Sequence, residues 1–342
     1  MRIIHCTPDH SIQWDDFVMQ NDSATFYHLF AWKEINEKCF GHQTFYVAAI
    51  DGNQVRGIFP IVFLKSRLFG RILCSMPFVN RGGPCASDSE TVDALVDEAR
   101  RILEVNQADY LEIRSLSKLN TSVPTSEHKI SMTIGLSEDP EDLWKSFKSK
   151  HRTNIRSAYH QGFNTLLGGA ELLDEFYDIL AESWRSLGTP LYAKSYFEEI
   201  IKHFASSTSI FLVIHRGKPV GTAFNGLHRQ TVEGLWAGTI ADYRRSDANY
   251  VLYWEMIKHY CEAGFEWFHL GRSTVDSGAE AFKRKWLAHG CQLYWLYILG
   301  RTREVPHLGV GNPRYQPAIQ AWKRLPLAVT KRIGPMIAKS IP

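Results

Sequence analysis

The 342-residue sequence is long enough for two domains of ordinary size, and 44% hydrophobic with 22% charged residues is typical of a soluble globular protein. It has no run of about 18 apolar residues, no apolar signal segment at its N-terminus and no Cys-x-x-Cys pair among six cysteines. We therefore expect no membrane-spanning helix, no zinc site and no disulfide framework. We expect a cytoplasmic location. Six of the 39 basic residues follow Glu304, where no acidic residue occurs, so the C-terminal tail makes the net charge positive.

The first half of the chain predicts a helix, a β-hairpin, a second helix and a strand, in that order. Residues 31–35 space their aromatic and aliphatic side chains as an amphipathic helix does. Strand-like runs within residues 45–63 flank a turn at Gly52, because glycine readily adopts the positive φ that a tight hairpin turn needs. Serine and aspartate, both good N-caps, then open a helical pattern over residues 87–103, and residues 110–115 form a strand-like run that ends in Arg-Ser.

The second half repeats this order. Residues 196–200 match the first helix, and residues 211–227 form a second hairpin pattern around Gly217, 165 residues after the glycine of the first hairpin. Ser-Asp again opens a helical pattern, here over residues 246–263, and residues 267–273 again end in Arg-Ser. We infer an internal duplication and an α/β (α+β) fold: two tandem units, each a mixed, mostly antiparallel sheet flanked by helices. The alternative is two unrelated halves that share common hairpin signals.

Residues 137–162, between the two halves, predict one strongly basic helix. Proline and acidic side chains near its start suit a helix N-terminus, and Gly162 suits its C-terminal end. Arg152 and Arg156 belong to the basic side chains that follow. These side chains either form a solvated charged face or bind an anionic group of a substrate, such as phosphate.

Several segments resemble the FemAB-like proteins, which have the GNAT acyltransferase fold in two copies. The resemblance rests on HRTNIRSAYHQG at 151–162, on ADYRRSDANYVLYWEMIKHYCEAGFEWFHLGRS at 241–273 and on EAFKRKWLAHGCQLYWLYIL at 280–299. The ending NPRYQPAIQAWKRLPLAVTKRIGPMIAKSIP at 312–342 is similar to that of one branch of the family, which is associated with exosortase/PEP-CTERM export systems.

The resemblance implies a first GNAT-like unit at residues 1–130, a second unit with the acyltransferase site at 131–305, and a basic amphipathic tail at 306–342. FemAB-like enzymes transfer amino acids from aminoacyl-tRNA to lipid-linked peptidoglycan precursors, and related GNAT enzymes use acyl-CoA. We therefore expect an acyl- or aminoacyltransferase that acts on an amine or hydroxyl of a cell-envelope or exopolysaccharide precursor. The donor substrate would be aminoacyl-tRNA or acyl-CoA, and no permanently bound cofactor or metal is expected.

The family also implies where the donor binds. GNAT enzymes hold the CoA pyrophosphate on backbone N–H groups at a helix N-terminus. Here Arg244, Arg245, Ser246 and Asn249 match that place, just before the second-half helix, and the two arginines suit bidentate contact with phosphate. Asn249 and Asp247 stand where the family pattern has small glycines, and Asp247 is equally a candidate N-cap.

The candidate catalytic residues are Lys283, Tyr253 and His269. The resemblance places Lys283, which follows a phenylalanine, near the active crevice, and Arg272 at a strand end that suits substrate contact. Acyl transfer to an amine needs a deprotonated nucleophile and a stabilised oxyanion, for which Tyr253 and His269 have suitable side chains. The alternatives are a solvent-facing basic run for Lys283, a structural ion pair for Arg272, and catalysis by substrate placement without a dedicated base.

The candidate acceptor-binding residues lie in the first half. Arg81 supplies charge, and Gly82 and Gly83 permit close approach of the backbone to a ligand. The similar segment of the family borders the acceptor cleft, and His28 and Trp32 would line the same cleft. The alternatives are a plain turn into the next helix and, for Trp32, a place in the core.

The tail and the overall activity each leave alternatives open. Basic and apolar side chains interleave in the tail, so it is either an anchor on anionic lipid, peripheral at the inner membrane, or an arm packed on the fold. The alternative to a transferase is a non-catalytic double-GNAT protein that binds a ligand or partner in an export or polysaccharide system. A nucleic-acid regulator would use the basic stretch of this helix at 145–156, but no recognised DNA-binding module accompanies it.

Overall fold

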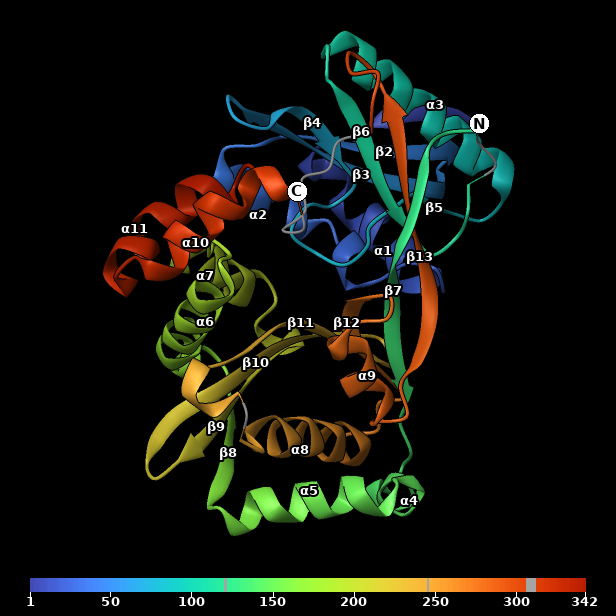
Figure 1. The fold of residues 1–342 in the computed structure, drawn as a ribbon. Coiled ribbons are helices and arrows are strands. Elements are labelled where there is room, and N and C mark those ends of the chain that lie inside the picture. The colour runs from blue at the N-terminus through green and yellow to red at the C-terminus, as the bar shows by residue number, and fades with distance from the viewer. Residues whose placement is uncertain (120–121, 245, 306–311) are drawn as a thin grey trace. The chain divides into compact units, whose positions relative to one another are not determined.

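The computed structural model describes residues 1–119, 122–244, 246–305 and 312–342, and by its internal contacts the chain forms two compact units (Figure 1). The first unit comprises Met1–Lys129, Gln292–Gly309 and Lys339–Pro342, and the second comprises Ile130–Cys291 and Val310–Ala338. The expected division of the sequence into domains at residues 1–130, 131–305 and 306–342 remains a prediction.

The first unit is a mixed sheet with helices on both faces. Its helices are α1 (Ser11–Gln20), α2 (Ala31–Phe40) and α3 (Ser89–Val105), and its strands are β1 (Arg2–His5), β2 (Gln43–Asp51), β3 (Gln54–Ser66), β4 (Gly70–Cys74), β5 (Cys85–Ala86), β6 (Tyr110–Ser115) and the C-terminal part of β13 (His289–Leu299). The strand order is β1-β2-β3-β4-β6-β13, with β5 on β3. Only the β4–β6 pairing among these is parallel in the described residues.

The predicted first hairpin forms as β2 and β3, and Gly52 in its turn has a φ of 59°. Side chains alternate between the two faces of the hairpin, as strand geometry requires. Val47 and Ala49 face the cluster formed with α3, whereas Tyr46 faces α1, where its ring lies 4.9 Å from that of Trp14. Both faces are therefore apolar and both are covered.

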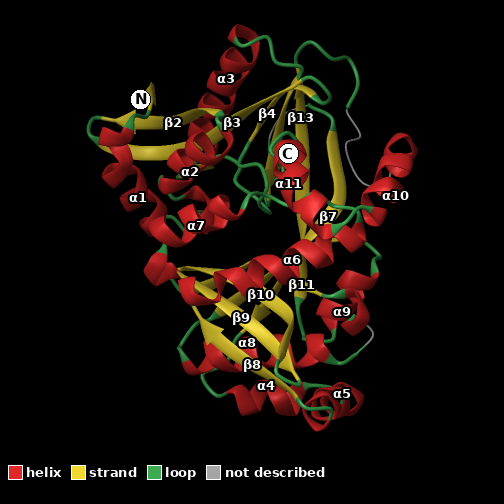
Figure 2. Ribbon diagram, turned by 90° about the vertical axis from the view of Figure 1, so that its left-hand side faces the viewer, coloured by secondary structure: helices red, strands yellow, loops and turns green. Residues whose placement is uncertain are grey.

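The second unit has the same plan. Its helices are α4 (Pro140–Ser146), α5 (Ser149–His160), α6 (Leu173–Leu187), α7 (Lys194–His203), α8 (Ala248–Glu262), α9 (Gly278–Arg284), α10 (Gln316–Arg324) and α11 (Leu327–Ala338), and its strands are the C-terminal part of β7 (Thr125–Gly135), β8 (Phe163–Gly168), β9 (Thr208–His215), β10 (Lys218–His228), β11 (Thr231–Thr239) and β12 (Trp267–Thr274). Figures 1 and 2 show α6 on one face of this sheet and α8 on the other, with α5 outside α8.

The strand orders within the two units confirm the predicted duplication. The order β8-β9-β10-β11-β12-β7 repeats β1-β2-β3-β4-β6-β13, and in both units the first four strands pair antiparallel whereas the fourth and fifth strands pair parallel. The Gly52 and Gly217 hairpins both join the second strand to the third, and Gly217 has a φ of 75°. The predicted fold class, two tandem units with mixed and mostly antiparallel sheets, is correct.

The final strand of each sheet is exchanged, which the sequence did not predict. β7 follows β6 in the chain, yet β6 pairs with β13, from Ser115 with Tyr294 to Tyr110 with Leu299. β7 instead lies beside β12 in the second sheet. The unit boundary accordingly falls inside both strands, after Lys129 in β7 and after Cys291 in β13.

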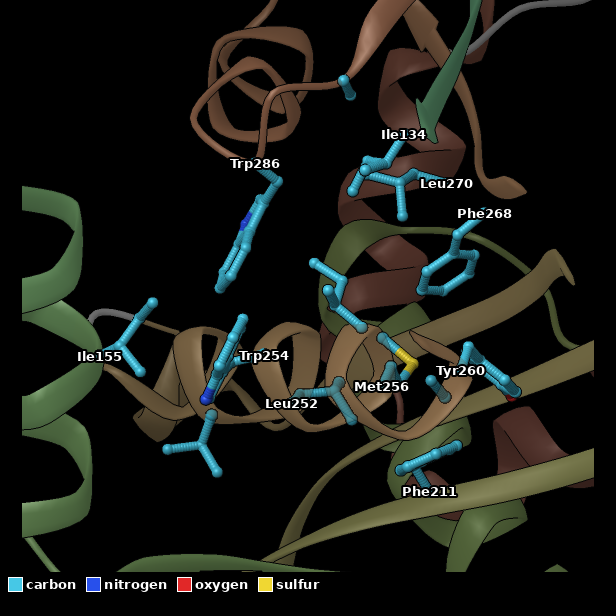
Figure 3. Close-up of a cluster of buried hydrophobic side chains, with 14 of the residues drawn as sticks. Ile134, Ile155, Phe211, Leu252, Trp254, Met256, Tyr260, Phe268, Leu270 and Trp286 are labelled. Carbon is cyan, nitrogen blue, oxygen red and sulfur yellow. The ribbon is translucent and has the colours of Figure 1, made fainter. Parts of the chain in front are cut away.

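An aromatic cluster on the α8 face forms the core of the second unit (Figure 3). Trp254 and Met256 of α8, Phe268 and Leu270 of β12 and Trp286 after α9 are at most 7% exposed. Burying side chains of this size stabilises the fold by roughly 1.5–3 kcal/mol each. The cluster fixes β12, α8 and α9 against one another, and these elements carry most of the candidate active site.

The helix predicted over residues 137–162 is divided in the structure. α4 ends at Ser146, Phe147 and Lys148 are extended, and α5 begins at Ser149. Phe147 is 3% exposed, with its ring 5.8 Å from that of Trp254 and 5.6 Å from that of Trp286. Burial of this one side chain in the tertiary core decides the break, because no glycine or proline stands there.

The C-terminal tail forms α10 and α11, which pack on α6. Trp322 of α10 is 7% exposed, and Arg185 of α6 donates to the carbonyl oxygen of Leu325 at 3.1 Å. Lys331 of α11 forms an ion pair with Asp178 of α6. The structure thus shows the packed arm, and within the described residues no helix is both long and apolar enough to cross a bilayer.

Candidate active site

The parallel strands β11 and β12 separate after a short ladder. Thr231 pairs with Trp267, Val232 with Phe268 and Glu233 with His269, and the described ladder ends there, although β11 continues to Thr239 and β12 to Thr274. The register between β10 and β11 shifts just beyond, so that Leu235 is an additional, bulged residue. A bulge leaves a backbone N–H outside the regular ladder and is common beside active sites.

The loop after β11 leads into α8, where sequence analysis predicted a phosphate site. Asp247 is the N-cap residue, as anticipated, but its carboxylate accepts from Gln161 Nε2 at 2.9 Å and makes no capping bond to α8 in the described chain. Asn249 accepts from Thr239 Oγ1 at 2.7 Å, and Ser246 Oγ donates to the carbonyl oxygen of Tyr243 at 2.5 Å. The first N–H groups of α8 are therefore not occupied by the N-cap side chain, and a helix start of this kind attracts anions.

The predicted donor-binding arginines have different surroundings. Arg244 donates to Ser183 and Ser186 of α6, with its Nη2 2.8 Å from the Ser183 carbonyl oxygen, so it holds the loop against α6. Arg245 lies outside the described residues. Arg152 Nη1 donates to the Lys145 carbonyl oxygen at 3.1 Å, near the C-terminal end of α4.

Arg156 also lies against α4. Its guanidinium carbon lies 5.3 Å from the centre of the Trp144 ring. The structure therefore shows both α5 arginines in contact with α4. Other contacts place the end of α5 beside α8, since Tyr159 of α5 donates to Glu255 of α8.

Lys283 of α9 is buried at the carboxyl end of β12. Its Nζ donates to the carbonyl oxygens of Gly271 at 3.1 Å and Arg272 at 2.9 Å, whereas Arg284 and Lys285 are exposed. Burial, and secondarily the Arg272 charge, lower the pKa of Lys283 to about 8. A solvent-facing basic run therefore does not describe Lys283, and Arg272 lies close enough to affect its charge.

The other two predicted catalytic residues differ in their suitability. Burial raises the pKa of Tyr253 to about 12, and its ring stacks 5.7 Å from that of Trp286, so this phenol stays protonated at neutral pH. His269 is 1% exposed on β12, and its Nδ1 lies 2.5 Å from Glu233 Oε2. Its Nε2 is hydrogen-bonded to the hydroxyl of Ser131 on β7.

Sequence reasoning missed Glu233 and Ser131. Both are buried, at 1% and 2% exposure, and each comes from a different strand than His269. For Glu233 the available signal was the one charged side chain of its strand, whereas Ser131 stands among other polar residues of β7 and gave no such signal. The partner of such a side chain follows from strand order, and β7 reaches β12 only because of the strand exchange.

The glycine-rich loop of the first unit is packed against its own chain. The N–H groups of Gly82 and Gly83 donate to the Arg114 carbonyl oxygen at 3.3 and 2.9 Å, and a Cβ on Gly83 would lie 3.0 Å from that oxygen. His28 Nε2 is 3.0 Å from the Gly83 carbonyl oxygen. Trp32 is fully buried and donates to Phe26, as the core alternative anticipated.

The first unit lacks the separated strands and the uncapped helix start of the second unit. Its own side chains and backbone groups make hydrogen bonds at the corresponding positions. Asp88 caps α3 by accepting from Thr91 N at 2.8 Å. Ser75 N donates to the Glu112 carbonyl oxygen at 2.9 Å, and Arg114 N donates to Ser75 Oγ at 2.9 Å. These bonds occupy β6 beyond its short ladder with β4, so the two units differ where a GNAT donor would bind.

Comparison with known proteins agrees with this asymmetry. Residues 145–284, all in the second unit, match the family model described as an acetyltransferase (GNAT) domain. Domains of this family use acyl-CoA as the donor. No curated protein sequence matches the chain.

Three solved structures resemble the fold over most of the chain. The crystal structure of FemX matches with a TM-score of 0.66 at 16% identity, over 94% of this chain and 100% of that one. A C-terminal domain of a lysylphosphatidylglycerol synthetase candidate from Agrobacterium fabrum matches with a TM-score of 0.56 at 14% identity, over 84% and 92%. A tandem GNAT protein from the clavulanic acid biosynthesis pathway matches with a TM-score of 0.52 at 12% identity, over 90% and 99%.

Proposed function

We propose that the second unit transfers an acyl group from acyl-CoA, or an aminoacyl group from aminoacyl-tRNA, to an amine or hydroxyl acceptor. One observation carries this proposal: the GNAT segment combines separated parallel strands with a helix start that its own N-cap side chain leaves uncapped. The separated strands suit an acyl group placed between them, and the uncapped helix start suits the phosphates of the donor.

The donor would bind from α8 toward the strands. Backbone N–H groups at the start of α8 would hold the pyrophosphate, with Ser246 and Asn249 beside it, and Arg245 is proposed as a further donor contact from its place in the sequence alone. Arg244 would support the loop through α6. Asp247, whose charge opposes phosphate, is turned to Gln161 and does not occupy this place.

The acyl carbonyl would lie near the point where β11 and β12 separate. The bulge at Leu235 offers a backbone N–H, and an oriented N–H is the kind of group that stabilises a developing oxyanion. An ammonium has three donors, of which Lys283 uses two on β12, and the third would stabilise negative charge on donor or intermediate. Arg272 would orient the acceptor from the same strand end.

The acceptor we propose is an amine or hydroxyl of a cell-envelope or exopolysaccharide precursor. The support is the sequence resemblance to FemAB-like proteins and the fold likeness to FemX. Arg81, with the loop around it, remains a proposed acceptor contact. The link to exosortase/PEP-CTERM export systems rests on the tail sequence and is part of this proposal.

The tail would keep the protein at the cytoplasmic face of an anionic membrane. Lys331 and Trp322 fasten α10 and α11 to α6, whereas Arg332 is exposed and Met336 is 70% exposed. The tail itself combines basic and apolar side chains and contains no acidic residue, which suits adsorption to anionic lipid.

Donor binding tests the proposed function directly. Calorimetric titration should show binding of CoA and acetyl-CoA, or a gel-shift assay should show binding of aminoacyl-tRNA. Asn249→Asp adds a negative charge at the start of α8 while keeping the acceptor for Thr239, so it should weaken donor binding about tenfold or more without lowering the melting temperature. Ser89→Asp, at the corresponding start of α3 in the first unit, is the matched control and should leave binding unchanged.

The outcomes separate the alternatives. Binding without transfer to any amine or hydroxyl acceptor would favour the non-catalytic double-GNAT protein. Absence of binding to CoA, acetyl-CoA and aminoacyl-tRNA would refute the transferase. Equal weakening by Ser89→Asp would place the donor in the first unit.

A further inference from the structure

The strand β8 forms an edge of the sheet in the second unit. It pairs with β9 over six residues, from Phe163 with His215 to Gly168 with Ile210, without a shift in register. It stands last in the strand order, so no described strand pairs with its other side. Alternate residues of an antiparallel strand direct their N–H and C=O groups to opposite sides. Half of β8 therefore directs these groups away from β9, where another strand can bind them.

The side chains of β8 leave this edge apolar and open. Leu166 is 51% exposed and Leu167 is 46% exposed, and consecutive side chains point to opposite faces of a sheet. The strand FNTLLG contains no charged residue, no proline and no β-bulge, which are features that usually protect an edge strand from further pairing. An added strand would cover an exposed leucine on each face.

The corresponding edge of the first unit is protected. β1 has the same place in the strand order, but it is four residues long, with Arg2 and His5 at its two ends. His5 is hydrogen-bonded to Glu98 of α3, with 2.9 Å between Nε2 and Oε1. A short edge strand that carries charged side chains resists pairing with another chain. Because the two units share one plan, the open edge is specific to the sequence of the second unit.

The exposed charges around β8 differ between its two ends. Arg216 and Lys218 are exposed beside the start of the strand, because the neighbouring His215 pairs with the first residue of β8. Glu171 and Glu175 are exposed shortly after its end. Two antiparallel β8 strands would place the basic end of one copy beside the acidic end of the other, whereas parallel strands would place like charges together. Opposite charges across an interface favour association and fix its orientation, so the surroundings of β8 complement a second copy of β8.

We propose that two copies of this protein associate through β8, antiparallel about a two-fold axis near Leu166, and so form one continuous sheet. In this register Leu166 lies opposite the partner's Leu166, and Leu167 lies opposite the partner's Thr165, as cross-strand pairs. The association adds backbone hydrogen bonds and removes leucine side chains from water. Both copies use the same edge, so the assembly closes at two copies. The proposal goes beyond the proposed function and does not depend on transferase activity.

Sedimentation velocity of the full-length protein tests the association. Between about 1 and 200 µM, the average mass should rise from 39.2 kDa toward twice that value, because a single strand edge is a small interface with a roughly micromolar dissociation constant. Leu166→Lys and Leu167→Lys each place a charge on the edge, and each should raise the dissociation constant about tenfold or more. Leu187→Lys is the matched control, since Leu187 is 54% exposed on α6 of the same unit, and it should leave the association unchanged.

Disulfide cross-linking tests the two-fold register. The background variant is Cys291→Ser, because Cys291 is an exposed cysteine. Residues directly opposite each other in an antiparallel pair have Cα atoms about 4.5–5.5 Å apart, which a disulfide can span. Leu166→Cys should therefore form a covalent dimer on mild oxidation, whereas Leu187→Cys should remain monomeric.

Charge exchange tests the antiparallel direction. Glu171→Lys and Arg216→Glu should each weaken the association a few-fold, because each places like charges at the two ends of the interface. The combined variant reverses both charges and should regain the affinity of the wild type. Melting temperatures near that of the wild type show that each variant remains folded.

Three results would overturn the proposal. One is a protein that stays at 39.2 kDa over the whole concentration range. Another is a dimer whose affinity Leu166→Lys and Leu167→Lys do not change, which would place the interface elsewhere on the surface. The third is equal cross-linking of Leu166→Cys and Leu187→Cys, which would indicate random collision. Donor binding to the wild type is measured separately, so failure of the dimer leaves the transferase untouched.

Discussion

Two buried ionisable side chains of the second unit show how position controls protonation. Lys283 donates to two strand carbonyls, and burial brings its pKa down to about 8. His151 of α5 is 5% exposed with its ring 4.3 Å from that of Trp286, and burial lowers its pKa to about 4. Sequence analysis selected the lysine from its place after a phenylalanine, but the buried state of either residue depends on packing around Trp286 and β12.

His151 predicts acid sensitivity of the second unit. Its pKa is about 4 when folded and 6.5 when exposed, so between these values the unfolded chain binds a proton that the folded protein does not. The His151 contribution to the free energy of unfolding should therefore decrease as pH falls, by about 2 kcal/mol between pH 7 and pH 5. Urea unfolding of wild type and His151→Phe at both pH values measures it, because the variant should lose less stability on acidification.

The matched control is His160→Gln, at an exposed position on the same helix. It should lose as much stability between pH 7 and pH 5 as the wild type. His42 has a pKa lowered to about 4 by burial in the first unit, so some acid loss should remain in the His151 variant. An identical loss in wild type and His151→Phe would contradict the assignment.

At the scale of single elements, local signals predicted turns and helix starts well. The hairpins at Gly52 and Gly217 and the Asp88 cap form as expected, because φ preferences and capping bonds involve only a few neighbouring residues. The prediction of one helix over residues 137–162 was wrong at Phe147, where packing against aromatic side chains distant in sequence determines the backbone conformation. The sequence did not decide whether the tail packs on the fold or binds a membrane, because an amphipathic pattern suits contact with either surface.

The exposed surface of α11 predicts lipid selectivity. Full-length protein should float with vesicles containing anionic phosphatidylglycerol and not with vesicles of phosphatidylcholine alone, and high salt should reduce flotation. Arg332→Glu, which reverses an exposed charge, should lower the bound fraction several-fold, because each basic residue near an anionic surface contributes about 1 kcal/mol. Arg67→Glu, at an exposed position in the first unit, is the control. Equal flotation of all three proteins, or none, would remove the membrane role.

At the scale of the molecule, the strand exchange joins the folding of the two units. The sheet of the first unit is completed by β13, from the far end of the chain, and that of the second unit contains β7. Each unit therefore needs a strand that lies beyond a simple cut in the sequence. The expected boundaries at 130 and 305 follow the repeat, whereas the contacts divide β7 and β13 internally.

The exchange predicts how fragments behave. A fragment of residues 1–136 lacks β13 and leaves the β6 edge unpaired, so we expect it to be poorly folded or to aggregate. Appending residues 292–300 to it through a flexible linker should restore cooperative melting. Circular dichroism melts and the dispersion of amide NMR signals compare the two fragments. Equal stability would mean that β7 can replace β13 beside β6.

The sequence alone determined the repeated helix, hairpin, helix and strand order and the class of fold. These features depend on local preferences, which act over a few residues and are written twice in this chain. Only the tertiary structure decided which strand completes each sheet, where α4 ends, and which side chains accompany His269. Glu233 and Ser131 lie far from His269 in the chain, and only the order of the strands brings the three side chains into one row.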